Sequence, residues 1–109
     1  MRGMNRVFLM GNLGSNPREG FSANGKPYVQ LNIATHRPHL NENGEREKTD
    51  WHHVFVWGKQ GENCQKYLKQ GDPLMMEGYL TSYKQVKESG KKENKTAIHA
   101  IRVEFLSKS

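Results

Sequence analysis

The chain has 109 residues, of which 17 are Lys or Arg and 11 are Asp or Glu, giving a formal net charge of +6 with histidine counted as neutral. This length predicts one domain spanning residues 1–109. Only 34% of the residues are apolar, and the longest apolar run, Val7 to Met10, is too short for a signal peptide or for the roughly 20 residues of a membrane-spanning helix. The single cysteine, Cys64, excludes an internal disulfide, so we expect a cytoplasmic or nucleoid-associated protein.

The charge is distributed unevenly along the chain. Residues 1–40 and 84–109 each carry a net charge of +4, and the stretch between them carries −2. A basic domain with clustered cations is typical of proteins that bind polyanions, among which nucleic acids are the commonest. A soluble basic domain with no such partner is the alternative at this point.

Three strands are predicted in the first half of the chain. The first covers Arg6 to Asn12, and an Asn-Gly reversal at residues 24–25 precedes the second, Tyr28 to Thr35. The polar stretch from His36 to Lys48 is predicted to be an exposed loop. The third strand covers Thr49 to Trp57, the most β-prone segment of the chain.

A short helix and two strands are predicted in the second half. The helix covers Lys59 to Gln70, with Gly71 as a left-handed cap. A fourth strand covers Leu74 to Tyr83, a basic hairpin arm covers Lys84 to Lys95, and a fifth strand covers Thr96 to Leu106. The predicted core face of the helix consists of Cys64, Tyr67 and Leu68.

This order of elements predicts an all-β fold. Three strands, a helix and two further strands form the sequence of a five-stranded Greek-key barrel of the oligonucleotide-binding type, the OB-fold. One short helix then lies between strands 3 and 4, and a long hairpin arm joins strands 4 and 5.

Side-chain alternation predicts which strand faces are buried. In the second strand Val29, Leu31 and Ile33 share one face, and the polar residues between them share the other with Tyr28. In the third strand one face carries His52, Val54 and Val56. The other face carries Trp51, His53, Phe55 and Trp57.

Two interpretations of the third strand are open from alternation alone. If the valines face the core, the aromatic side chains are exposed and suited to stacking with unpaired bases. If the aromatic residues form the core, the valines face solvent. The cations along the chain favour the stacking interpretation.

Cations and tyrosines predict where a nucleic-acid backbone would run. Tyr79 and Tyr83 come just before the basic arm and combine rings with nearby lysines. Lysines in an edge hairpin also guard against aggregation, which is the alternative role. The predicted backbone contacts are Arg6, Lys84, Lys87, Lys91, Lys92 and Lys95.

Catalysis and metal binding find little support in the sequence. There is no nucleophile motif or phosphate-binding loop, so we expect no enzymatic activity and no cofactor. His52 and His53 are adjacent in a strand and point to opposite faces, and no cysteine completes a set with His36 and His39. We therefore expect no metal site.

Several stretches resemble the DNA-binding domain of bacterial single-stranded DNA-binding proteins. They occur in the family's order across about residues 2–106. The matching stretches are Arg2-Gly3-Met4-Asn5-Arg6-Val7, Leu9-Met10-Gly11-Asn12-Leu13-Gly14, Pro17, Asn24-Gly25, Ile33-Ala34-Thr35, Thr49-Asp50-Trp51-His52, Val56-Trp57-Gly58-Lys59, Tyr67-Leu68-Lys69-Gln70-Gly71 and Glu77-Gly78-Tyr79-Leu80.

The resemblance implies an OB-fold homo-oligomer, a tetramer rather than a dimer, that coats single-stranded DNA during replication, recombination and repair. By position, Trp51 and Trp57 match stacking sites, Arg6 and Lys84 match basic contacts, and His52 matches a residue at the subunit interface. Two sites that usually carry tryptophan fall at or near His39 and Gln85.

The resemblance also raises two alternatives. Family members usually continue into an acidic C-terminal tail that recruits replication and repair proteins, and this chain stops at Ser109, so we expect a domain without that tail. A tail-less relative, the primosomal replication protein N type, is a dimer that acts beside a helicase. A protein-interaction module built on the same barrel is the other class of function.

Overall fold

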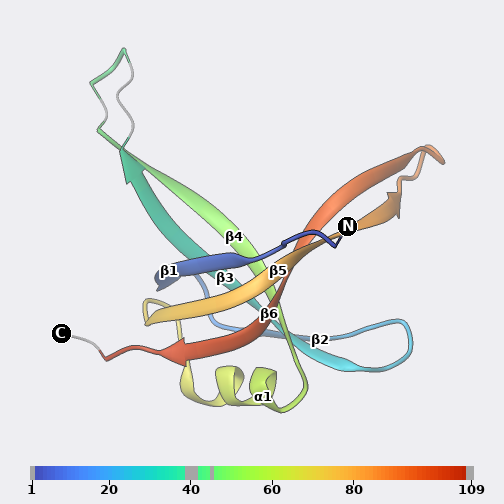
Figure 1. Ribbon diagram of the computed structural model, residues 1–109, viewed down its shortest axis with the longest axis horizontal. Helices are drawn as coiled ribbons and strands as arrows, with labels where there is room; N and C mark the ends of the chain where they lie inside the picture. Colours follow the sequence, from blue (N-terminus) through green and yellow to red (C-terminus); the bar gives the residue numbers. More distant parts are fainter. Residues whose placement is uncertain (1, 39–41, 45, 108–109) are drawn as a thin grey trace.

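The computed structural model describes residues 2–38, 42–44 and 46–107. Within them the chain forms six strands and one helix (Figure 1). No helix in these ranges is long and apolar enough to cross a membrane. The elements in chain order are β1 (Val7–Leu13), β2 (Arg18–Phe21), β3 (Pro27–Pro38), β4 (Glu47–Trp57), α1 (Gly58–Tyr67), β5 (Pro73–Val86) and β6 (Lys92–Phe105).

Five of these strands close into a barrel. β1 pairs with β5, β5 with β6, β6 with β4, β4 with β3, and β3 again with β1. The β4–β6 pairing is parallel, and the other pairings of the ring are antiparallel. The predicted five-stranded OB-fold barrel is confirmed, with its helix between the third and fourth strands of the ring and its long arm between the fourth and fifth.

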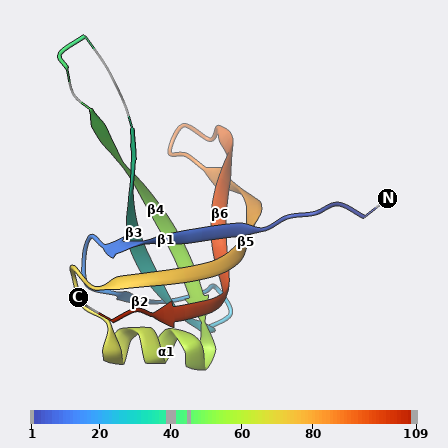
Figure 2. The same cartoon turned by 60° about the vertical axis from the view of Figure 1, so that its left-hand side comes forward.

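Two long hairpins extend from the barrel on the side away from α1 (Figures 1 and 2). One consists of the outer ends of β3 and β4, and the other consists of the outer ends of β5 and β6. The helix lies at the opposite end, where Cys64 and Leu68 join the hydrophobic core. Burial raises the pKa of the Cys64 thiol to about 11.

The short strand β2 was not predicted from the sequence. It has no apolar alternation, and it forms because the chain reverses tightly and lays Arg18–Phe21 against β3. The reversal is the predicted Asn-Gly turn: Gly25 has a φ of +80°, and the amide of Ser22 donates to the carbonyl of Lys26 at 2.9 Å. β2 lies outside the closed ring.

The loop predicted over residues 36–48 is shorter than expected. β3 continues to Pro38 and β4 begins at Glu47, because cross-strand polar pairs support a ladder that has no core beneath it. Arg37 Nε donates to Asp50 Oδ2 at 2.6 Å, and this hydrogen bond lowers the pKa of Asp50. His36 Nδ1 lies 3.3 Å from Glu47 Oε1.

The helix is also shorter than predicted, because it ends at Tyr67 rather than Gln70. Gly71 has the expected positive φ of +93°, but it belongs to the following turn, in which the amide of Asp72 donates to the carbonyl of Lys69. The placement of Tyr67 on the core face was wrong. Its ring is exposed at the end of the helix, 6.3 Å from the ring of Phe105 between centroids.

The hydrophobic core follows the predicted alternation. The inward side chains of β3 and β4 are fully or almost fully buried, and they pack with residues of β5 and α1. The largest fully buried side chains are Leu31, Ile33, Leu74, Met76, Val54, Val56 and Cys64.

Replacing Leu31 by alanine should lower the free energy of unfolding by about 2–5 kcal/mol, because its side chain is 0% exposed and its loss leaves a cavity. Leu80→Ala is the matched control, since Leu80 is 43% exposed, and it should cost less than about 1 kcal/mol. Urea unfolding followed by circular dichroism measures both. Equal losses for the two variants would contradict this assignment of the core.

Candidate nucleic-acid interface

The outer face of β4 carries a row of aromatic side chains. Val54 and Val56 point inward and are completely buried, whereas Trp51 on the other face is 55% exposed. The interpretation that the valines form the core is therefore confirmed, and the alternative that the aromatic residues form it is wrong. Strand geometry turns Phe55 and Trp57 outward with Trp51.

Rings from the neighbouring strands gather around Phe55 and Trp57. Tyr28 of β3 pairs with Trp57 across the ladder, and its ring centroid lies 5.1 Å from that of Trp57 and 5.2 Å from that of Phe55. His99 of β6 is the parallel partner of Phe55, with their centroids 5.7 Å apart. Tyr79 of β5 stacks on His99 at 5.6 Å.

These rings form one exposed or half-buried surface drawn from four strands. A hollow of about 530 Å³ opens between this surface and the β2–β3 turn. Tyr83 lines the hollow from the base of the β5–β6 arm, together with the small residues Ser22, Ala23, Thr81 and Ala97. We call the aromatic members the aromatic surface: Tyr28, Phe55, Trp57, Tyr79, Tyr83 and His99.

An irregularity in the ladder turns β5 and β6 out of the barrel. Glu77 pairs with Arg102 and Gly78 with Ala100, which leaves Ile101 as an extra residue on β6. A Cβ atom on Gly78 would lie 2.1 Å from the carbonyl oxygen of His99, so only glycine permits this close approach. Beyond this point Tyr79 and Tyr83 share a face with His99.

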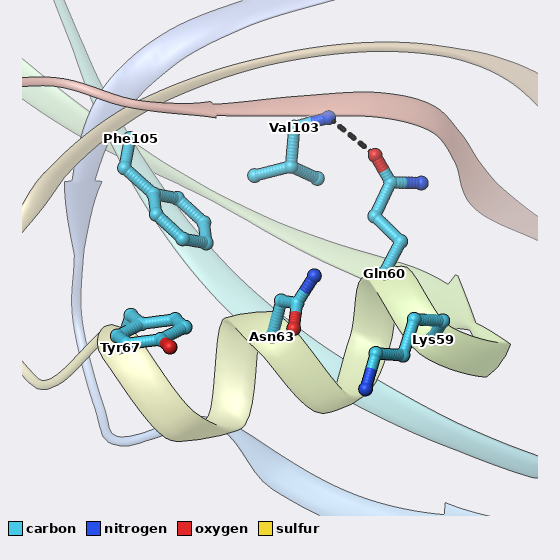
Figure 3. A pocket seen from close by; sticks show the side chains of 6 residues that line it. All are labelled: Lys59, Gln60, Asn63, Tyr67, Val103 and Phe105. Atoms are coloured by element: carbon cyan, nitrogen blue, oxygen red, sulfur yellow. Dashed lines mark hydrogen bonds between the residues drawn. The ribbon is translucent and has the colours of Figure 1, made fainter.

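The helix holds β6 at the same irregularity. Gln60 Nε2 donates to the carbonyl of Ile101 at 3.1 Å, and Gln60 Oε1 accepts from the amide of Val103 at 2.8 Å. Figure 3 shows Gln60 and Val103 in a second hollow, of about 590 Å³, between α1 and β6. Tyr67 and Phe105 line its other end.

Cations lie beside the aromatic surface in two places. Lys26 Nζ is 5.3 Å from the ring centroid of Trp57. On the arm, Glu93 lies between two lysines, with its carboxylate 3.2 Å from Lys95 Nζ and ion-paired with Lys87. The hydrogen bonds from Lys87 and Lys95 hold the pKa of Glu93 below its usual value.

The predicted lysines of the arm divide between its two faces. Register pairs Tyr83 with Lys95, which places Lys95 on the face that continues the aromatic surface. Lys84 is adjacent to Tyr83 in the strand and therefore points the other way, and so does Lys92, the partner of Val86. Lys91 lies in the turn, where its carbonyl accepts from the amide of Lys87.

Trp51 lies away from the aromatic surface, farther along β4, and His53 lies between Trp51 and Phe55 on the same strand face. Trp51 is six residues from Trp57, or about 20 Å of extended strand. Its ring packs against Gly14, where a Cβ atom would lie 2.2 Å from the indole. His53 Nδ1 is hydrogen-bonded to Gln30 Nε2 at 3.0 Å.

Arg6 and His52 lie elsewhere on the barrel. Arg6 Nε is 3.4 Å from Glu77 Oε2, in a network with Arg102 on the outer side of β1, β5 and β6. His52 has the inward direction of its strand, is half-buried, and bonds through Nε2 to Thr35 Oγ1 at 2.8 Å. The structure therefore does not bring these two residues together with the aromatic surface.

Three residues of the site were absent from the predicted set: Tyr28, Lys26 and His99. Alternation had already placed Tyr28 on the wet face of its strand, so a signal for it was present. His99 has no local signal, because it reaches Phe55 only through the parallel pairing of two distant strands. Gln85 shares the face of Tyr83 on the arm, and His39 lies outside the described residues.

A metal site was not predicted, and the described part of the chain contains no group of three or more histidine, cysteine or acidic side chains that could hold an ion.

A sequence model of the single-strand binding protein family matches residues 4–106. The chain belongs to this family. It is 38% identical over 80 residues to single-stranded DNA-binding protein 1 of Chlorobaculum tepidum, covering 72% of this chain and 49% of that protein. It is 33% identical over 106 residues to the single-stranded DNA-binding protein of Xanthomonas axonopodis pv. citri, covering 96% and 59%.

Solved structures of family members share the fold. The wild-type single-stranded DNA binding protein of Thermus aquaticus superimposes with a TM-score of 0.80 at 30% identity, covering 98% of this chain and 52% of the other. The Plasmodium falciparum SSB in complex with ssDNA gives 0.81 at 24% identity, covering 98% of both chains. The chain spans only 49% and 59% of the length of the two relatives named above. Both relatives are named as single-stranded DNA-binding proteins, which does not favour the alternative of a primosomal replication protein N type.

Proposed function

We propose that this chain binds single-stranded DNA without sequence preference, by stacking bases on the aromatic surface and holding the backbone with lysines. The observation that carries the proposal is the partly exposed cluster of rings from four strands, centred on Phe55, Trp57 and His99. Any base has a face that can stack on such rings, whereas a paired duplex conceals its base faces. The names of the bacterial relatives support the same ligand.

The proposed role is to protect and organise single-stranded DNA during replication, recombination and repair. The proposed location is the cytoplasm and the nucleoid, where replication and repair proteins would be its partners. Binding of this kind needs no cofactor and no chemical step. Trp51 and His53 would receive DNA farther along β4. Lys84, Lys92 and Arg6 point away from the aromatic surface, so their predicted contacts require the strand to wrap around the arm or the barrel.

Self-association is part of the proposal. β1 pairs with β3 only through Asn12 and Leu13, so beside Val7–Met10 the described residues place no strand on that edge. The outward side chains Phe8 and Met10 are 65% and 64% exposed. An open edge and apolar side chains suit pairing with a second copy, and a tetramer, with His52 at an interface, is the proposed state.

Phe55→Leu should weaken binding to a fluorescein-labelled oligothymidylate by about 5- to 150-fold, because a stacked base is worth ~1–3 kcal/mol and leucine keeps the bulk but not the ring. Phe105→Leu is the matched control, since Phe105 lies beside α1 away from the aromatic surface. Fluorescence anisotropy measures both. Equal affinity of the wild type for duplex, or equal losses for the two variants, would overturn the proposal.

Glu93→Gln should strengthen binding by about 2- to 5-fold at low salt, because it removes the carboxylate that pairs with Lys87 and Lys95. Each additional phosphate contact should also steepen the dependence of log affinity on log salt by about 0.7. Glu104→Gln makes the same charge change beside Arg102, away from the arm. The same gain in both variants would show an effect of net charge alone.

Native mass spectrometry should find the mass of four 12.6 kDa chains. Phe8→Glu should dissociate the assembly, because it places a charge on the open β1 surface. Phe21→Glu is the matched control, since Phe21 is 63% exposed on β2, and it should leave the mass unchanged. A monomeric wild type, or an unchanged mass for Phe8→Glu, would contradict the proposed assembly.

A further inference from the structure

His99 is at the centre of the aromatic surface. Its imidazole lies roughly parallel to the rings of Phe55, Trp57 and Tyr79, with centroid distances of 5.7, 6.0 and 5.6 Å. The planes of His99 and Trp57 are within 12° of parallel. No other side chain described here lies roughly parallel to three rings of this surface, so the orientation of the surface depends on this imidazole.

A hydrogen bond fixes the protonation state of His99. Trp57 Nε1 lies 2.9 Å from His99 Nδ1. The indole nitrogen can only donate, so Nδ1 must accept and carries no proton. The imidazole in this arrangement is therefore neutral, with its proton on Nε2.

Protonation of His99 would remove this acceptor. An imidazolium has two N–H donors, so the Trp57 N–H would face another donor and lose its partner. The indole would then be free to turn away from the plane that it shares with His99. A charge would also appear among rings that are already partly withdrawn from water.

The groups around His99 offer nothing to offset that charge. β4 contributes Phe55 and Trp57, and β5 contributes Tyr79, Thr81 and Tyr83, none of which has a carboxylate. From the β2–β3 side Tyr28 lines the same hollow and Lys26 lies over Trp57. None of the residues that line the hollow is a carboxylate.

We propose that neutral His99 is a positioning residue, which holds the Trp57 indole as a stacking platform for bases and releases it when Nδ1 is protonated. This inference rests on the proposed function and adds to it a dependence on pH. Burial lowers the pKa of His99 from its ordinary value of 6.5, so release occurs below that pH. Bases that stack on the surface desolvate it further and favour the neutral form, so affinity falls as pH falls through this range.

The first experiment uses the free protein. The chain has two tryptophans, so ¹⁵N-labelled protein gives two indole N–H signals, which Trp51→Phe assigns. The Trp57 signal should shift with a midpoint below pH 6.5, while the Trp51 signal, with no such partner, stays in place. A Trp57 signal that is unchanged from pH 7.5 down to the lowest pH at which the protein stays folded would overturn the proposal.

Two variants test the hydrogen-bond acceptor and the aromatic ring of His99 separately. In His99→Asn the side-chain oxygen can replace Nδ1 as an acceptor but does not titrate, so the Trp57 signal should keep its bonded position at every pH. In His99→Phe the ring remains without an acceptor, and the signal should take the unbonded position at every pH. His53→Asn, on the same strand as Trp57, is the control and should retain the wild-type titration. If either His99 variant is unfolded, the wild-type titration still decides the question.

The second experiment measures binding to oligothymidylate from pH 7.5 to 5.0. The ratio of wild-type affinity to His99→Asn affinity cancels the contributions of the other histidines. This ratio should fall by about 2- to 10-fold at the lower pH, the effect of losing one net hydrogen bond. A flat or rising ratio would overturn the role of His99. Absence of binding at every pH would instead overturn the proposed function, and the indole titration would still report on the hydrogen bond.

Discussion

The barrel and the aromatic surface both depend on the parallel pairing of β4 with β6. This pairing joins Val54 to Ile98 and Phe55 to His99. Because neighbouring residues of a strand point to opposite faces, it places Val54 and Ile98 on the core side and Phe55 and His99 outside. One short contact therefore closes the hydrophobic core and assembles the centre of the surface. A slip of one residue would exchange the two faces together.

The ladder irregularity beside this pairing gives the surface its shape. The extra residue Ile101 lets β5 and β6 leave the barrel as an arm, and Gly78 allows the close approach that this requires. Gln60 of α1 bonds to the backbone of the extra residue Ile101 and to that of Val103, two residues farther along β6. The helix thus does more than close one end of the barrel, because it also fixes where the arm begins and how Tyr79 meets His99.

Geometry also decides how the positive charge can be used. The net charge of +6 indicates a polyanionic partner, but the arm turns Lys84 away from the aromatic surface and pairs Lys87 and Lys95 with Glu93. Arg6 is likewise paired with Glu77. Glu93 therefore partly neutralises the two lysines of the arm, through ion pairs that salt weakens, whereas Lys26 lies directly over the Trp57 ring.

The sequence by itself determined the inward faces of β3 and β4, the Asn-Gly turn and the order of elements in the barrel, because alternation and turn preference are local properties of the chain. Alternation also indicated that the ring of Tyr28 lies on the outer face of its strand. Only the tertiary structure decided that His99 meets Phe55 and Trp57, and that Arg6 and Trp51 lie apart from them. Those neighbours are set by the register between strands that are distant in sequence. That register depends on how the whole barrel closes, and no local sequence pattern contains this information.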